Sequence, residues 1–192
     1  MSEQPHLADV RVGSATDGRV PVSFASRSLA ADARQWLSMA VVALAAIAAD
    51  QVTKEITRAE LALGEAVDLA GPFAIHHVRN TGIAFGLFPG QASPVTILTG
   101  IAVIWMLFYF ARAGARHPLF PVAFGFLLGG SMSNLADRVR QGYVTDFLDP
   151  EYWPAFNLGD VFITIGVALL LAVFFLGERR PQVHRRPHGG SA

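Results

Sequence analysis

Four long apolar runs alternate with polar segments along the chain. The first extends from Trp36 to Ala49, the second over about residues 95–111, the third from residue 119 to about Met132, and the fourth from about Asn157 to Leu176. A helix that crosses a lipid bilayer needs about 20 predominantly apolar residues. The pattern therefore predicts a polytopic membrane protein with four transmembrane helices.

The first run reaches that length only if the polar residues that follow it belong to the same helix. Among them are Asp50 and Lys54, which are four positions apart and therefore share one helix face. Two interpretations are open. The pair is either a salt bridge where the helix leaves the membrane, or part of a wet site, because charges inside a span are rarely without function.

Between the first and second runs, residues 58–92 contain no clear span and are interrupted by glycine and proline. The segment 73–78 has the composition of a β-strand, so we expect a small, partly extended layer on one membrane surface. Arginine is frequent in both terminal tails and at 112–116, and positively charged loops stay in the cytoplasm. We therefore expect cytoplasmic termini, with residues 58–92 and 138–156 on the other side.

Composition agrees with a membrane domain. Hydrophobic residues make up 52% of the 192 positions and charged residues 16%, against roughly 25% charged residues in soluble domains. The formal net charge is zero, which gives no signal for nucleic acid. There is no cysteine, which excludes disulfides and a cysteine nucleophile within the chain. We expect a disordered basic tail at 1–34, a membrane domain at 35–178 and a second polar, basic tail at 179–192.

Three aspartates lie near one membrane edge in this topology. Asp137 ends the third run, Asp146 lies in the loop after it, and Asp160 begins the fourth run. Two carboxylates that share a proton can hydrolyse an amide, because the ionised one takes a proton from water while the protonated one polarises the carbonyl. The aspartates therefore indicate acid–base catalysis that requires no metal or cofactor.

Other catalytic chemistries have weaker support. His76 and His77 are adjacent, so on a strand they point to opposite faces, and we expect no metal site. The chain has no Gly-x-Ser-x-Gly segment of the kind that carries a nucleophilic serine in hydrolases. Ser131 and Ser133 lie in the segment Gly129–Ser133, and we interpret its glycines and serines as small residues that allow close helix packing.

Several polar residues near the aspartates have two interpretations. Asn80 forms a turn with the following glycine or binds the backbone of a substrate. Asn134 and Asn157 each precede an aspartate by three residues. We expect each of them to hydrogen-bond either an acid or the backbone. Asn157 also suits a helix cap. Arg138 extends to the interface or pairs with Asp137. Four aromatic residues fit an interfacial belt: Trp36, Tyr143, Tyr152 and Trp153.

Together these segments resemble lipoprotein signal peptidases over about residues 36–178. The matching stretches occur in the order of the family and on the expected helices and loops. They are Asp50–Lys54, Asn80–Gly86, Gly129–Arg138, Val144–Phe147 and Phe156–Asp160.

The resemblance implies an aspartyl membrane protease that removes the signal peptide from a prolipoprotein, just before a cysteine that carries diacylglycerol. The catalytic aspartates of the family fall on Asp146 and Asp160, and Asp137 falls on a supporting aspartate. The other positions that the family uses around the site fall on Asp50, Lys54, Asn80, Gly82, Asn134, Arg138 and Asn157.

The resemblance also implies the fold and the partners. The fold would be mainly α, with four transmembrane helices, a small extracytoplasmic β-cradle and a short helix lying over the membrane. The protein would work as a monomer in a bacterial inner membrane, without cofactor. Its partners would be the prolipoprotein and membrane lipid, and the peptide antibiotic globomycin would inhibit it.

The chain departs from the family pattern at three positions. Ile83 and Gly159 stand where the family commonly has alanine, and Ser133 stands where it has glycine. The alternative function is a small membrane transporter or assembly factor in which the aspartates form a proton or ion path. That alternative predicts acids near the middle of the membrane and often an internal repeat. A family member without activity is a third alternative, against which the retained Asp146 and Asp160 argue.

Overall fold

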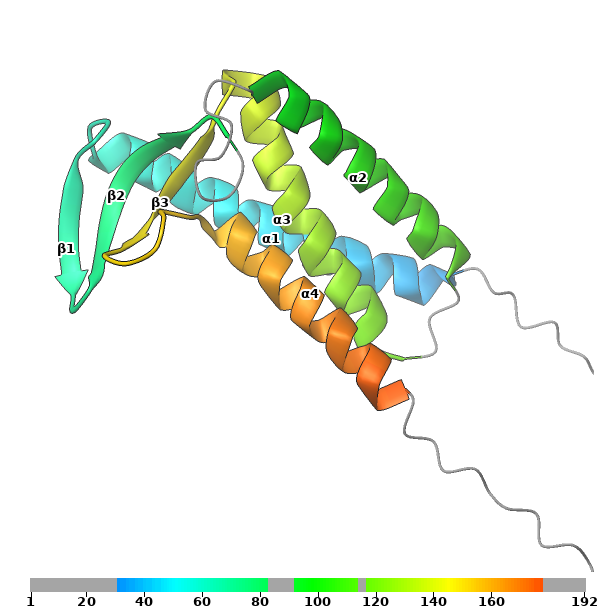
Figure 1. The fold of residues 1–192 in the computed structure, drawn as a ribbon. Coiled ribbons are helices and arrows are strands. Elements are labelled where there is room, and N and C mark those ends of the chain that lie inside the picture. Colours follow the sequence, from blue (N-terminus) through cyan, green and yellow to red (C-terminus); the bar gives the residue numbers. More distant parts are fainter. Residues whose placement is uncertain (1–30, 83–91, 114–116, 178–192) are drawn as a thin grey trace, which may run out of the picture.

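The computed structural model describes residues 31–82, 92–113 and 117–177 (Figure 1). Residues 1–30 of the first expected tail, the second expected tail at 179–192 and the departure at Ile83 lie outside the described residues. Each helix is long and apolar enough to cross a membrane, which confirms the four predicted spans. The helices are α1 (Ala33–Glu60), α2 (Ala92–Arg112), α3 (Leu119–Gln141) and α4 (Leu158–Gly177).

Helix α1 begins at Ala33, within the segment expected to be a tail, because Asp32 caps it. The Asp32 carboxylate accepts a hydrogen bond from the Gln35 backbone N–H, and the Gln35 side chain accepts one from the Asp32 N–H. This reciprocal pair is a capping box. The helix has 28 residues and is therefore about 42 Å long, more than the roughly 30 Å hydrocarbon core of a bilayer.

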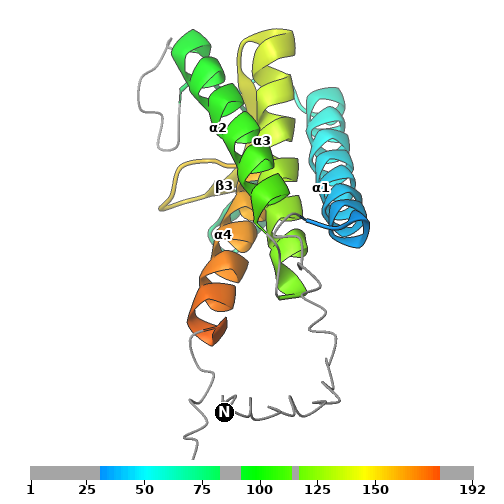
Figure 2. The ribbon, with the colours of Figure 1, turned by 90° about the vertical axis from the view of Figure 1, so that its right-hand side faces the viewer.

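Helix α3 is the central helix and packs against the other three. Figure 2 shows α1 and α4 on different sides of it. On the α1 side, a Cβ atom added to Gly129 would lie 2.7 Å from the Ala46 Cβ and 2.8 Å from the Ala43 carbonyl oxygen. The glycine is thus required for the close approach of the two helices. This confirms the packing role predicted for the small residues at 129–130.

The contact between α3 and α4 is equally close. A Cβ atom added to Gly130 would overlap the carbonyl oxygen of Gly159, and one added to Gly166 would lie 2.7 Å from the Leu127 side chain. The close contact at Gly130 brings the polar last turns of α3 against the first turn of α4, where Asp160 lies.

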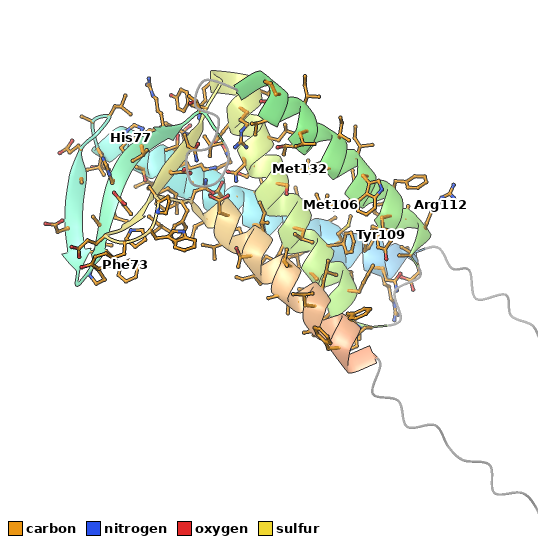
Figure 3. All side chains as sticks on the ribbon, viewed as in Figure 1. Phe73, His77, Met106, Tyr109, Arg112 and Met132 are labelled. Atoms are coloured by element: carbon orange, nitrogen blue, oxygen red, sulfur yellow. The ribbon has the colours of Figure 1, made fainter. Side chains whose placement is uncertain are left out.

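Apolar packing dominates the opposite end of the bundle. The buried cluster there contains Phe110 of α2 and Phe124 of α3, whose ring centroids lie 5.4 Å apart, together with Met39 of α1. Figure 3 shows Tyr109 and Arg112 at this end of α2, far from His77 and Phe73 on the sheet. The buried polar residues are therefore concentrated toward the sheet end of the molecule.

A three-stranded antiparallel sheet with the order β1-β2-β3 lies at that end (Figure 1). Strand β2 (Phe73–Asn80) confirms the strand predicted at 73–78, and it pairs with β1 (Ala66–Ala70) and β3 (Val144–Pro150). Strand β3 lies where the sequence predicts a loop. That prediction is wrong, because the strand forms by pairing with β2, which is distant in the chain. In the described residues, no short helix besides the four long ones is present.

Candidate active site

A cleft of about 520 Å³ lies between β2, β3, the end of α3 and the start of α4. Its lining includes Trp153, which the sequence placed only in an aromatic belt. The other apolar lining residues are Val144, Pro154, Ala155, Phe156, Val161, Ile163 and Ile165. The polar lining residues are Asn80, Asn134, Arg138, Asp146, Asn157, Asp160 and Thr164.

Strand β3 carries Asp146 into the cleft, where the residue is 1% exposed. Its Oδ1 accepts a hydrogen bond of 2.6 Å from Nδ2 of Asn157, and its Oδ2 accepts one of 2.9 Å from Nδ2 of Asn80. Burial, with a smaller contribution from the negative charge of Asp160, raises the pKa of Asp146 to about 6, although both hydrogen bonds act in the opposite direction. A carboxyl group of this kind stays protonated at a higher pH than an ordinary aspartate.

Asp160 lies in the first turn of α4. Its Oδ1 accepts a hydrogen bond of 3.0 Å from Nδ2 of Asn134, and its Oδ2 accepts one of 3.3 Å from the backbone N–H of Asn157. In return, the Asp160 N–H donates to Oδ1 of Asn157 at 3.1 Å. Asn157 is therefore the cap of α4 and also a partner of Asp146, so both interpretations made for it are confirmed.

Three asparagine amides face the two acids in fixed orientations. Each amide oxygen accepts a hydrogen bond from another group, which turns the NH₂ group toward an aspartate. The donor to Oδ1 is the Gly82 N–H for Asn80, at 3.0 Å, and the Lys54 ammonium for Asn134, at 2.8 Å. The donor to Asn157 is the Asp160 N–H described above. The turn predicted at Asn80 is thus confirmed, and the same side chain also holds Asp146.

Lys54 is fully buried in an ionic cluster beside the cleft. Its Nζ lies 2.6 Å from Oδ2 of Asp50 and 2.9 Å from Oδ2 of Asp137, in addition to its contact with Asn134. Lys54 thus forms two ion pairs and donates one hydrogen bond, to the amide oxygen of Asn134. The predicted salt bridge between Asp50 and Lys54 is therefore confirmed. It is 0% exposed at both residues and contacts a residue of the cleft.

Asp137 and Arg138 do not pair with each other. Adjacent residues on a helix point in different directions, and Asp137 turns to Lys54 and to Nε2 of Gln51, which is 2.9 Å away. Arg138 turns to the cleft, where it donates to the carbonyl oxygens of Gly82, at 3.0 Å, and Asn134, at 3.4 Å. The predicted Asp137–Arg138 pair is therefore wrong.

Ser133 and Gln51 are two polar residues whose roles the sequence did not reveal. Ser133 is 0% exposed, and its hydroxyl donates to Oδ2 of Asp50 at 2.7 Å and accepts from Nε2 of Gln51 at 2.9 Å. Its interpretation as a packing residue alone is wrong. Ser133 and Asp137 are four residues apart and share a helix face, a signal that could have identified a second polar face on α3. Gly159 adds a backbone N–H to Oδ1 of Asp50 at 2.8 Å.

The two histidines of β2 have different partners. Nδ1 of His76 lies 2.6 Å from Oδ2 of Asp149, and Nδ1 of His77 lies 2.9 Å from the carbonyl oxygen of Leu61. Across residues 31–82, 92–113 and 117–177, no group of three or more His, Cys, Asp or Glu side chains is arranged to hold a metal ion.

Comparison with known proteins identifies the family. The family model described as "Signal peptidase (SPase) II" matches residues 42–176. The chain belongs to the signal peptidase II family. A lipoprotein signal peptidase of Symbiobacterium thermophilum is 37% identical over 145 residues, which cover 73% of this chain and 95% of that relative. The lipoprotein signal peptidase of Mesorhizobium japonicum is 32% identical over 159 residues, or 80% of this chain and 95% of the relative.

Two solved structures, each described as a bacterial membrane enzyme, share the fold. One is 27% identical with a TM-score of 0.70 and covers 77% of this chain and 93% of its own. The other is 30% identical with a TM-score of 0.64 and covers 71% and 91%. These likenesses confirm the predicted family, fold class and enzyme class, an aspartic protease of the signal peptidase II family in a polytopic membrane protein. They set aside the transporter alternative.

Proposed function

We propose that the protein is an aspartic endopeptidase that removes the signal peptide from diacylglyceryl-modified prolipoproteins, cutting before the lipidated cysteine, with Asp146 and Asp160 activating water. The observation that supports this most directly is the placement of the two acids. They come from β3 and α4, line the same cleft, and are joined through Asn157, which hydrogen-bonds both.

Hydrolysis by this pair needs one carboxylate and one carboxyl group. The carboxylate takes a proton from water while the water oxygen bonds to the scissile carbonyl carbon, and the carboxyl group gives its proton to the carbonyl oxygen. The tetrahedral diol then collapses. Its C–N bond breaks as the nitrogen takes the proton held by the first acid, and one diol hydroxyl returns a proton to the second. The products are an acid and an amine, and the pair returns to its initial state.

The lining of the cleft suits a substrate that is partly peptide and partly lipid. Its apolar residues include Val161 and Ile165 of α4, a helix that also carries exposed apolar residues such as Leu171 and Phe174. We infer that acyl chains reach the cleft along this helix. Among the polar lining residues, Asn80 and Arg138 would bind the peptide backbone, and the inhibitor globomycin would occupy the same space.

The arrangement in the membrane follows from the charges. The sheet and the cleft are at one end of the bundle, whereas Arg112 and both arginine-bearing tails are attached at the other. Positively charged segments remain in the cytoplasm. We therefore propose that a monomer lies in a bacterial inner membrane with both termini in the cytoplasm and the active site on the outer side.

A cleavage assay tests this function. Purified protein in detergent is incubated with a diacylglyceryl-modified prolipoprotein and with the unmodified form, and products are separated by gel electrophoresis. We expect cleavage of the lipidated form alone, inhibition by globomycin, and a loss of at least about 10²-fold in rate for Asp146→Asn and for Asp160→Asn.

The matched control is Asp149→Asn, which removes an acid of β3 that pairs with His76 and does not line the cleft. This variant should cleave at the normal rate. Full activity in either Asp146→Asn or Asp160→Asn would refute the pair, and equal cleavage of the unmodified prolipoprotein would refute the substrate class.

A further inference from the structure

The two acids of the cleft are held by different kinds of partner. We propose that Lys54, acting through Asn134, is a positioning residue that keeps Asp160 ionised, so that Asp160 is the base that takes the proton from water and Asp146 carries the proton. The inference rests on the proposed function, because it assigns the two roles within the proposed catalytic pair.

The first asymmetry is the contact between Lys54 and Asn134. Two of the three asparagines that face the acids are oriented by backbone N–H groups, those of Gly82 and Asp160. Asn134 alone among the three is oriented by a charged side chain, the Lys54 ammonium. With its oxygen occupied by the ammonium, Asn134 presents only N–H to Oδ1 of Asp160. An amide that can only donate favours the ionised, acceptor form of a carboxyl group.

The second asymmetry is the place of each acid in its element. Asp160 lies in the first turn of α4, where the helix dipole and free backbone N–H groups favour a negative charge. Its Oδ2 already accepts one such N–H, from Asn157. Asp146 lies within β3 and has two neutral amides as its partners, so no comparable field favours its charged form.

The third asymmetry is contact with solvent. Asp146 is 1% exposed, whereas Asp160 is half-buried at the edge of the cleft. A group in contact with water retains its charge more easily than one removed from water. It is also the group that an attacking water molecule can reach. The raised pKa of Asp146, about 6 because of burial, agrees with its role as the proton donor.

The remaining charges near Asp160 do not reverse this assignment. Helix α1 contributes Asp50 and Lys54, α3 contributes Asp137 and Arg138, and β3 contributes Asp146. Asp50 and Asp137 are both paired with the Lys54 ammonium. Arg138 is cationic and donates to the backbone oxygen of Asn134, so that it holds the same residue that faces Asp160.

The assignment gives each proton a definite path. Asp160 accepts a proton from the attacking water, and Asp146 gives its proton to the scissile carbonyl oxygen. When the C–N bond breaks, Asp160 returns its proton to the leaving nitrogen and a diol hydroxyl returns one to Asp146. Both acids then have the protonation with which they began.

Infrared spectroscopy tests the assignment without relying on activity. The band of a protonated, buried carboxyl group is followed between about pH 5 and 8 in the whole protein, in Asp146→Asn and in Asp160→Asn. We expect the band in the unaltered protein and in Asp160→Asn, and its loss in Asp146→Asn. A band that is lost in Asp160→Asn and kept in Asp146→Asn would overturn the inference, while the cleavage assay would still decide separately whether the pair is catalytic.

The role of Lys54 is tested by the double variant Asp50→Asn, Lys54→Met. It removes one charge of each sign, so that the net charge of the buried cluster is unchanged, but it leaves the Asn134 oxygen without its donor. We expect the acidic limb of the plot of kcat/KM against pH to move toward higher pH, by about tenfold in proton concentration. The kcat should be lower, and the KM should change little.

The control is Ser133→Ala, which disturbs the same cluster at Asp50 without touching Asn134. Its acidic limb should remain in place. An unaltered limb in the double variant, with only thermal stability reduced, would show that Lys54 has a structural role alone. An equal shift of the limb in Ser133→Ala would also overturn the assignment to Lys54.

Discussion

The side-chain amide of Asn157 lies 2.6 Å from Oδ1 of Asp146, so the residue that begins α4 also holds the acid of β3. The same side chain accepts the N–H of Asp160. Asn157 is 0% exposed and therefore connects the start of a membrane-spanning helix to the sheet without contact with bulk water. Capping of the helix and assembly of the site depend on one residue.

These two roles of Asn157 can be separated by substitution. Serine caps a helix about as well as asparagine but has no amide to reach Asp146. We expect Asn157→Ser to keep the cap of α4, but kcat should fall by about 10-fold or more because one buried hydrogen bond to Asp146 is lost. The serine variant should also lose about 1–3 kcal/mol of stability, because Oδ1 of Asp146 is left buried without its donor. Asn157→Ala should lose the cap as well and be less stable than the serine variant by about 1 kcal/mol. Full activity of the serine variant would contradict the role given to the amide.

The approach of α3 to α4 predicts a strong effect at Gly130. A methyl group there would overlap the carbonyl oxygen of Gly159, and the two helices would have to separate. We expect Gly130→Ala to lower the free energy of unfolding by about 1–3 kcal/mol, measured by thermal unfolding.

The matched control for that variant is Gly100→Ala on α2, where an added Cβ meets no atom within 4 Å. Alanine has the higher helix propensity, so this variant should be as stable as the unaltered protein or slightly more so. A loss of stability at both positions would show that the close contact is not the cause.

The hydroxyl of Ser133 should stabilise the ionic cluster. Ser133→Ala removes one donor from Asp50 and one acceptor from Gln51, and buried polar groups without partners cost about 1–3 kcal/mol. Thermal unfolding should show this loss. Ser131→Ala, a half-buried position on the same helix, should change stability by about 0.5 kcal/mol or less. Equal effects at the two serines would argue against the cluster.

The raised pKa of Asp146 predicts two effects of pH. As pH rises through about 6, Asp146 loses its proton, so kcat/KM should fall on the alkaline side of its profile. The folded state also binds this proton more tightly than the unfolded chain, so the contribution of Asp146 to stability is present below its usual pKa of 3.8 and is lost as pH rises to about 6.

Thermal unfolding at several pH values measures the second effect. Asp146→Asn has no such proton, so its unfolding temperature should lack this part of the decrease between about pH 4 and 6. If the variant and the unaltered protein show the same dependence over that range, the proton belongs to another group.

The sequence by itself determined the four spans and the family, and it selected Asp146 and Asp160 as the pair that we propose to be catalytic. Length and hydrophobicity are local properties, so the runs ending near Ala49, Met132 and Leu176 identified helices without reference to the fold. The order of the aspartate and asparagine segments identified the family, which the comparisons confirm. Strand β2 was predictable for the same local reason, but β3 was not, because it forms by pairing with residues far away in the chain.

Only the tertiary structure decided which polar groups contact one another. The sequence placed Asp50 and Lys54 on one face but could not show that the face is buried against Asn134 and Ser133 of another helix. It placed Asp137 beside Arg138, yet helix geometry directs the two side chains to different partners. Hydrogen bonds and ion pairs act over about 3 Å, and only the packing of α1, α3 and α4 brings these side chains within that range.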